Sequence, residues 1–275
     1  MQFWLQIIGI FVLADTGTIL GLLTKRFKKG LWLLGYIVPL ILILLIALPR
    51  HLYWLVLYPP FSWLNAGRRE YIVFAFAIPM LFSTLIPRIE SLRLKILVSI
   101  LVAVACSFFF IIPFVSPLLV RKELRNLEPG TFYNGTYIQA ADYTCGPAAA
   151  VNALFQLGIE ADERELAIYA YTSPHTGTSD DLLAKAIEKL YGSQGVTCKY
   201  RRFDSISDMK GNCPVIVVTR FSFLVDHYVT VIEVTDDKVV IANPATGREA
   251  LTYEEFRRFI KQVRKNIFTF QNKEL

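Results

Sequence analysis

Residues 139–154 read Gln-Ala-Ala-Asp-Tyr-Thr-Cys-Gly-Pro-Ala-Ala-Ala-Val-Asn-Ala-Leu, and the second half of the chain is organised around them. Gly-Pro interrupts an extended run, and the alanine-rich segment that follows favours a helix whose first turn holds Cys145. Unpaired backbone N–H groups and the positive end of the helix dipole stabilise a thiolate there, and the thiolate is the nucleophilic form of cysteine. Gln139, six residues earlier, could donate its amide N–H to an oxyanion. The stretch alone leaves open whether Cys145 is reactive or a small buried core residue.

The composition divides the 275 residues into two parts. Long apolar runs dominate before residue 121, whereas the sequence after residue 130 mixes charged, polar and apolar residues as soluble domains do. We therefore expect a transmembrane domain in residues 1–120, a linker in residues 121–130 and a second domain in residues 131–275.

Four apolar segments in the first part are long enough, or nearly so, to cross a bilayer as helices, which predicts an all-α four-helix transmembrane domain. They are residues 3–23, 31–49, 71–87 and 96–120. A further segment, residues 52–64, contains Pro-Pro and is too short to span, so it is expected to be interfacial or re-entrant. A fifth span there would move the second domain to the other side of the membrane.

Basic residues give the expected orientation. Lys25, Arg26, Lys28 and Lys29 directly follow the first span, and no basic side chain precedes it. By the positive-inside rule the N-terminus is then outside, and four spans also place residues 131–275 outside the cytoplasm. These flanking residues account for the net charge of +6, and no nucleic-acid motif accompanies them, so we expect the lipid bilayer and no nucleic acid as a partner.

The second domain is predicted to be α+β, with helices first and an antiparallel sheet after them. Helices are expected after Cys145 and after the capping patterns that begin at Asp162, Thr178 and Thr252. Strands are expected at residues 196–203, 215–221, 227–233 and 239–243, with a final strand at residues 266–270.

His227 and Asn243 form the second half of the candidate site. His227 begins one predicted strand and Asn243 ends the next, so an antiparallel hairpin brings the two side chains together. A Cys, a His and an orienting amide constitute a papain-like apparatus, in which the His takes the thiol proton and the Asn holds the ring. Taken singly, His227 could be a strand-edge histidine and Asn243 a turn former before Pro244.

Five features together resemble the bacteriocin-processing cysteine peptidases, papain-like domains that are usually fused to ABC exporters and cut leader peptides after a double glycine. They are Gln139, residues 142–148 around Cys145, Gly177-Thr178-Ser179, His227-Tyr228-Val229 and residues 243–247. The resemblance covers residues 131–275. It implies Cys145 as nucleophile, His227 as base and Gln139 as oxyanion donor. Asn243 stands where that family usually has Asp, so the resemblance also predicts that Asn243→Asp retains activity.

The expected function is hydrolysis of a peptide bond in a leader or small peptide near a bacterial inner or plasma membrane. Acyl or peptidyl transfer through the same Cys145 thioester and peptide binding without cleavage are the alternatives. A peptide substrate and a separate exporter are the expected partners, because the sequence carries no phosphate-binding loop of its own. No cofactor or metal is expected. Cys198 and Cys213 are expected either as a disulfide or as free thiols.

Overall fold

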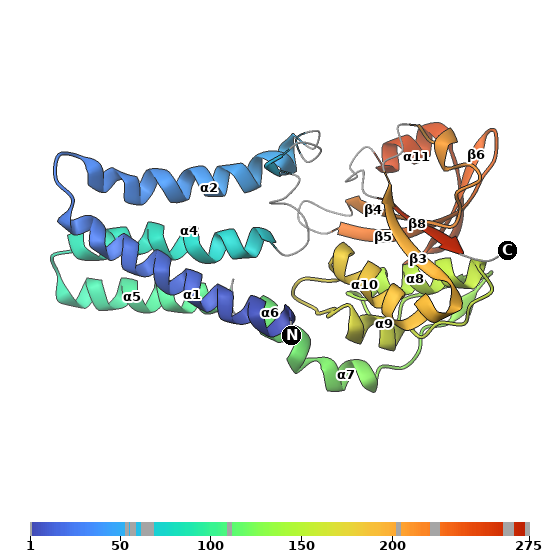
Figure 1. The fold of residues 1–275 in the computed structure, drawn as a ribbon, viewed down its shortest axis with the longest axis horizontal. Helices are drawn as coiled ribbons and strands as arrows, with labels where there is room; N and C mark the ends of the chain where they lie inside the picture. Colours follow the sequence, from blue (N-terminus) through green and yellow to red (C-terminus); the bar gives the residue numbers. More distant parts are fainter. Residues whose placement is uncertain are drawn as a thin grey trace. The chain divides into compact units, whose positions relative to one another are not determined.

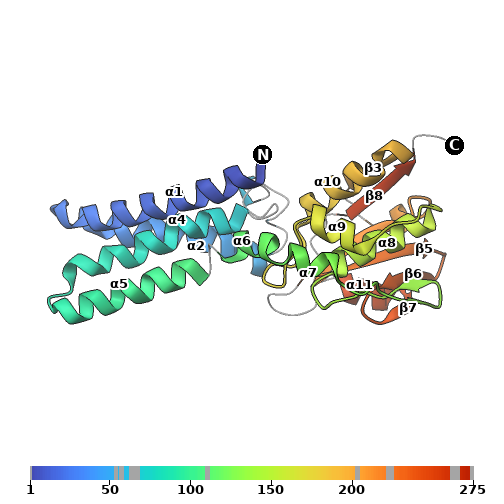
Figure 2. The same ribbon diagram turned by 90° about the horizontal axis from the view of Figure 1, so that it is seen from below.

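A computed structural model describes residues 2–52, 55, 59–61, 69–108, 112–201, 205–220, 226–260 and 267–272. The chain divides into two compact units, Met1–Ser116 and Pro117–Leu275. Figures 1 and 2 label most helices and strands of the two units.

The first unit is helical, and its long helices lie side by side in both views (Figures 1 and 2). The helices are α1 Gln2–Leu23, α2 Leu34–His51, α4 Arg69–Leu85, α5 Leu92–Cys106 and α6 Ile112–Leu119, the last of which runs into the second unit. Three stretches, Ile8–Arg26, Leu31–Leu48 and Tyr71–Arg88, are long and apolar enough to cross a membrane. They correspond to the first three expected spans.

The fourth expected span, residues 96–120, is not confirmed as one membrane-crossing helix. It falls on α5 and α6, and residues 109–111 between them lie outside the described part of the chain. Most of the segment expected to be interfacial, residues 52–64, also lies outside the described residues.

Glycines allow α1 to pack closely against α4. A Cβ added to Gly17 would lie 2.3 Å from the carbonyl oxygen of Phe76, and one added to Gly21 would lie 2.6 Å from that of Met80. Small residues spaced by four let two helix backbones approach in this way, which stabilises helix pairs where burial of apolar surface gives little driving force. From α4, Thr84 Oγ1 also donates to the carbonyl of Gly35 in α2 at 3.2 Å.

The second unit is an α+β domain, as the sequence predicts. Its helices are α7 Arg121–Arg125, α8 Cys145–Gln156, α9 Glu163–Tyr169, α10 Asp180–Tyr191 and α11 Tyr253–Ile260. A small hairpin pairs β1 Phe132–Tyr133 with β2 Thr136–Tyr137. The main sheet contains β3 Val196–Arg201, β4 Val215–Arg220, β5 Asp226–Val234, β6 Lys238–Asn243, β7 Gly247–Thr252 and β8 Ile267–Asn272.

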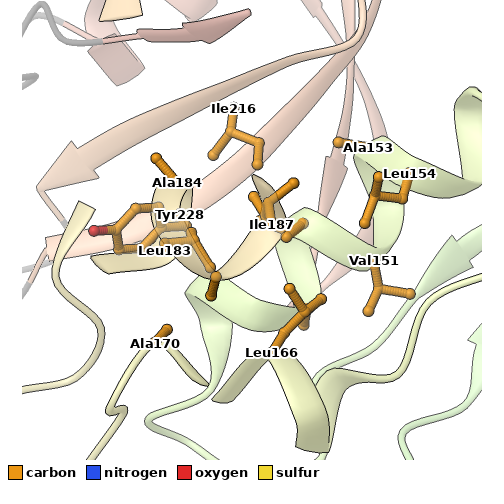
Figure 3. Packing of buried hydrophobic residues seen from close by; sticks show 14 of the residues in the cluster. Val151, Ala153, Leu154, Leu166, Ala170, Leu183, Ala184, Ile187, Ile216 and Tyr228 are labelled. Carbon is orange, nitrogen blue, oxygen red and sulfur yellow. The ribbon is translucent and has the colours of Figure 1, made fainter. Parts of the chain in front are cut away.

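The six strands are antiparallel and follow the spatial order β3-β8-β4-β5-β6-β7. Residues alternate between the two faces of the sheet, so successive residues of one strand enter different cores. Ile216 and Tyr228 pack with α8, α9 and α10, as Figure 3 shows, whereas Val217 and Val229 pack with Phe256 of α11. Helices on both faces bury the sheet, and they fix the position of the β5-β6 hairpin relative to α8.

Two features of the sheet were not predicted from the sequence. β7 is an edge strand that the sequence analysis missed, and the C-terminal strand β8 inserts between β3 and β4. This insertion decides between the two expectations for the cysteines, because Cys198 is in β3 and Cys213 lies two residues before the start of β4. Strands that are not neighbours lie about 10 Å apart, beyond the reach of a disulfide. Both cysteines are free thiols.

Candidate active site

Cys145 is the first residue of α8, as the Gly-Pro-Ala sequence predicts, and its side chain is buried. The loop before it is fixed by Thr144, whose Oγ1 donates to the carbonyl of Ala141 at 2.8 Å and accepts from the N–H of the same residue at 3.1 Å. The thiol is therefore held at the positive end of a twelve-residue helix.

Gln139 is held from two sides in the same loop. Its backbone N–H donates to the carbonyl of Pro244 at 2.9 Å, which joins this loop to the end of the β5-β6 hairpin. Its side-chain Nε2 donates to the carbonyl of Ala141 at 2.9 Å. An amide nitrogen carries two hydrogens, so within the part of the chain that the structure describes one donor of Gln139 remains for a ligand.

Glu163 holds the loop between Gln139 and Cys145 through a backbone hydrogen bond, a role that the sequence did not suggest. Both of its carboxylate oxygens accept from the backbone N–H of Ala140, at 3.1 and 3.2 Å, and the side chain is almost fully buried. Burial raises the pKa of this carboxyl, and hydrogen bonds from the loop only partly oppose that shift.

His227 and Asn243 are in direct contact, with Nε2 of the imidazole 2.8 Å from Oδ1 of the amide. Two further bonds fix the orientation of that amide. Its Oδ1 accepts from the backbone N–H of Ala245 at 3.0 Å, and its Nδ2 donates to Oε1 of Glu249 at 3.2 Å. Since Oδ1 can only accept, Nε2 of His227 carries a proton, and in the neutral ring Nδ1 is left as the acceptor.

Thr178 brings the start of α8 and the start of β5 to one place. A Cβ added to Gly146, the residue after Cys145, would lie 2.9 Å from the Cβ of Thr178. The hydroxyl of Tyr228, the residue after His227, donates to the carbonyl of Thr178 at 2.9 Å. Farther along the same two elements, Thr230 Oγ1 donates to the carbonyl of Ala149 at 2.7 Å.

The four residues predicted from the sequence thus lie in one connected arrangement. Thr178 joins the elements of Cys145 and His227, a hydrogen bond joins His227 to Asn243, and the Pro244 carbonyl joins the hairpin to Gln139. The sequence analysis missed Glu249, because it did not predict β7, the strand on which Glu249 lies.

Burial sets the acid–base properties of the site and of the other thiols. It lowers the pKa of His227, and the hydrogen bond to Asn243 and the charge of Glu249 oppose that shift. Burial also raises the pKa of Cys198 to about 12 and that of Cys213 to about 11, with nearby carboxylates adding to both shifts. These two thiols are therefore poor nucleophiles near neutral pH. Among the residues that the structure describes, no group of His, Cys, Asp and Glu side chains could hold a metal ion.

Two curated archaeal proteins are similar in sequence to this chain. An uncharacterized protein of Methanothermobacter marburgensis is 34% identical over 110 residues, which cover 40% of this chain and 71% of the relative. An uncharacterized protein of Methanothermobacter thermautotrophicus is 31% identical over 121 residues, which cover 44% of this chain and 79% of the relative.

Two solved structures are similar in fold to about half of the chain. A double glycine motif protease from an AMS/PCAT transporter, solved with its leader peptide, is 19% identical with a TM-score of 0.41, and the match covers 50% of this chain and 91% of that one. The peptidase domain of Streptococcus ComA, a bifunctional ABC transporter, is 17% identical with a TM-score of 0.42, and the match covers 50% and 96%.

The family assignment rests on the sequence of the second unit. The Peptidase C39 family matches residues 135–263, a segment that includes all four predicted site residues. This match confirms the resemblance to the cysteine peptidases of the double-glycine type. Through residues 135–263, this chain belongs to the Peptidase C39 family.

Proposed function

We propose that this protein is a membrane-embedded cysteine peptidase that hydrolyses a peptide bond in a leader or small peptide of the double-glycine type. The observation that carries the proposal is the contact between His227 Nε2 and Asn243 Oδ1 at 2.8 Å. This contact leaves Nδ1 of the ring as the proton acceptor. Thr178 contacts both the start of β5, which carries His227, and the start of α8, which carries Cys145.

In the first half of the reaction, His227 takes the proton of the Cys145 thiol, and the thiolate attacks the carbonyl carbon of the scissile bond. The oxygen of that carbonyl becomes an oxyanion, which the free hydrogen of Gln139 Nε2 and the backbone N–H of Cys145 would stabilise. When the tetrahedral intermediate collapses, the C–N bond breaks and His227 gives its proton to the leaving amine. Cys145 is left as a thioester.

In the second half, water attacks the thioester carbon while His227 accepts one of the water protons. Collapse of this second intermediate breaks the C–S bond, releases a peptide carboxylate and returns the proton to the sulfur. Asn243 holds the imidazole in the tautomer and orientation that both halves need. An amine in place of water would give the transferase reaction.

The membrane part of the proposal rests on the first unit. Three of its helical stretches have the length and composition of spans, and apolar side chains such as Ile8, Val12 and Leu44 are each more than half exposed within the unit. Lipid would cover these surfaces. We further propose that residues 1–120 form the membrane domain, and that the basic run 25–29 faces the cytoplasm, with residues 131–275 outside it.

A cleavage assay on the full chain in detergent or liposomes tests the proposed reaction. The substrate is a synthetic leader peptide ending in Gly-Gly before a short cargo, and the control peptide replaces both glycines by leucine. We expect cleavage after the second glycine by the wild type, none by Cys145→Ala, and almost none by His227→Ala, since the two residues act as a unit. Cys213→Ala, which removes a thiol outside the proposed site, should leave the rate within about 2-fold.

Mass spectrometry of the products separates the alternatives. Hydrolysis gives a free carboxylate on the leader, whereas transfer to an added amine gives the corresponding amide. A leader that binds with measurable affinity but stays intact with the wild type would support a binding module and refute the peptidase. Separately, a membrane-impermeant protease should reach residues 131–275 in intact cells, and protection there would overturn the proposed orientation.

A further inference from the structure

Three polar groups meet at the side chain of Asn243. Its Oδ1 accepts from His227 Nε2 at 2.8 Å and from the Ala245 N–H at 3.0 Å, and its Nδ2 donates to Glu249 Oε1 at 3.2 Å. A carboxylate oxygen only accepts hydrogen bonds, so the contact with Glu249 selects the amide orientation in which Oδ1 faces the histidine.

Glu249 is itself held in place. It lies on β7 and is paired in register with Ile241 of β6, two residues before Asn243, so strand pairing fixes its backbone next to the end of β6. The hydroxyl of Thr246 in the connecting turn donates to the same Oε1. Two donors therefore converge on one carboxylate oxygen of a half-buried side chain.

We propose that Glu249 is a positioning residue of the candidate active site, which orients Asn243 toward His227. Glu249 also supplies a negative charge behind Asn243, one hydrogen bond farther from the ring than the Asp that the resembling peptidases usually have at the orienting position. The inference rests on the proposed peptidase function. It explains why a neutral amide occupies position 243, because a carboxylate there would face a second carboxylate directly.

The proposal reverses one expectation from the family resemblance. Asn243→Asp would replace an N–H donor by an oxygen at the 3.2 Å contact with Glu249. Two carboxylates at that distance cannot both ionise without a large penalty, so one takes up a proton or the pair separates. A shared proton would keep a hydrogen bond between the two carboxyls, but at a pH where that proton is lost the pair separates and residue 243 loses the contact that orients it. There we expect kcat to fall about 10-fold, the effect of one net hydrogen bond.

The charge of Glu249 also acts on the ring. The described contacts of His227 include the Thr219 hydroxyl of β4, which donates to its backbone carbonyl, and Asn243 of β6, which in turn contacts Glu249. Among these described groups, Glu249 is the carboxylate that raises the pKa of His227 against burial. Removing its charge should therefore lower the pKa of the ring.

The test compares Glu249→Gln, Glu249→Ala, Asn243→Asp and the double variant Asn243→Asp with Glu249→Gln in the full chain. Glu249→Gln keeps an oxygen that can accept from Asn243, so kcat should fall only about 3-fold, whereas Glu249→Ala should lose about 10-fold with KM unchanged. The double variant removes the second carboxylate and should recover to within about 3-fold of wild type. Glu254→Gln, on the exposed side of α11, is the matched control and should change neither kcat nor KM.

Histidine titration by NMR gives a readout that a merely structural role would not move. The chain has three histidines, so a 13C-histidine sample yields few signals, and the signal missing in His227→Gln identifies the ring. Glu249→Gln should lower the pKa of His227 and move the acidic limb of the rate profile to lower pH, because the ring must be neutral to take the thiol proton. Asn243→Asp with Glu249→Gln should raise that pKa and move the same limb to higher pH.

The outcomes separate the two proposals. An unchanged His227 titration in Glu249→Gln, or a double variant no more active than Asn243→Asp alone, would overturn the role of Glu249. If the wild type cleaves no peptide, the proposed function fails, and the titration still decides whether Glu249 acts on His227.

Discussion

Gln139→Ala is the variant whose effect the structure isolates best. The loop that carries Gln139 is anchored by backbone groups, namely the Gln139 N–H on the Pro244 carbonyl at 2.9 Å and the Ala140 N–H on Glu163. Truncating the side chain removes one bond, from Nε2 to the Ala141 carbonyl, and Oε1 has no hydrogen-bond partner among the described residues. The loop should therefore keep its conformation.

The expected loss is that of one oxyanion donor. Such donors contribute about 2.7–4 kcal/mol to the transition state, which corresponds to a fall of about 10²–10³ in kcat, and the donor acts on charge that is absent from the bound substrate. KM should consequently change little. The unfolding temperature should also stay close to wild type, because the loop loses one part-buried hydrogen bond worth about 1 kcal/mol.

The assay is steady-state cleavage of a fluorogenic double-glycine leader peptide by the full chain, with enzyme concentration normalised by thiol titration. Gln156→Ala, at the exposed C-terminal end of α8, is the matched control, since it removes the same kind of side chain at the end of α8 that lies away from the loop. An unchanged kcat for Gln139→Ala would refute the oxyanion role. A large fall in unfolding temperature that accounts for the lost activity would refute the argument that the loop is anchored independently.

Three further predictions concern reactivity, packing and pH. Limited alkylation near pH 7 should modify Cys145 before Cys213, whose pKa is raised to about 11, and faster loss of Cys213 would contradict the assignment of the nucleophile. Gly21→Leu should lower the unfolding temperature or expression of the full chain because its side chain would meet the α4 backbone, whereas Gly9→Leu, with nothing within 4 Å, should not. Burial raises the pKa of Glu163, so the stabilisation from its bound proton is full below about pH 4.3 and is lost as pH rises through the raised value. Glu163→Gln should flatten that decline in a thermal-unfolding series from pH 4 to 7, and equal slopes for both proteins would count against it.

The sequence by itself was enough for the features that depend on local chemistry. Gly146 and Pro147 followed by an alanine run determine that a helix begins at Cys145, because those residues stop an extended segment and favour helix at once. The hairpin between β5 and β6 brings His227 to Asn243, because the two strands are joined by a short turn and therefore pair antiparallel. The change in composition near residue 121 separates an apolar part from an α+β part.

Tertiary structure decided the features that depend on contacts between distant segments. β8 inserts between β3 and β4 although Arg201 of β3 pairs with Ile267 of β8, which lies 66 positions later in the chain (267 − 201). No local pattern encodes that choice, which keeps Cys198 and Cys213 apart. The Gln139 N–H meets the Pro244 carbonyl only because the sheet and α8 pack together. Glu249 lies on an edge strand that is half exposed and has a weak apolar pattern, so its contact with Asn243 could be found only once strand pairing had placed the two side chains side by side.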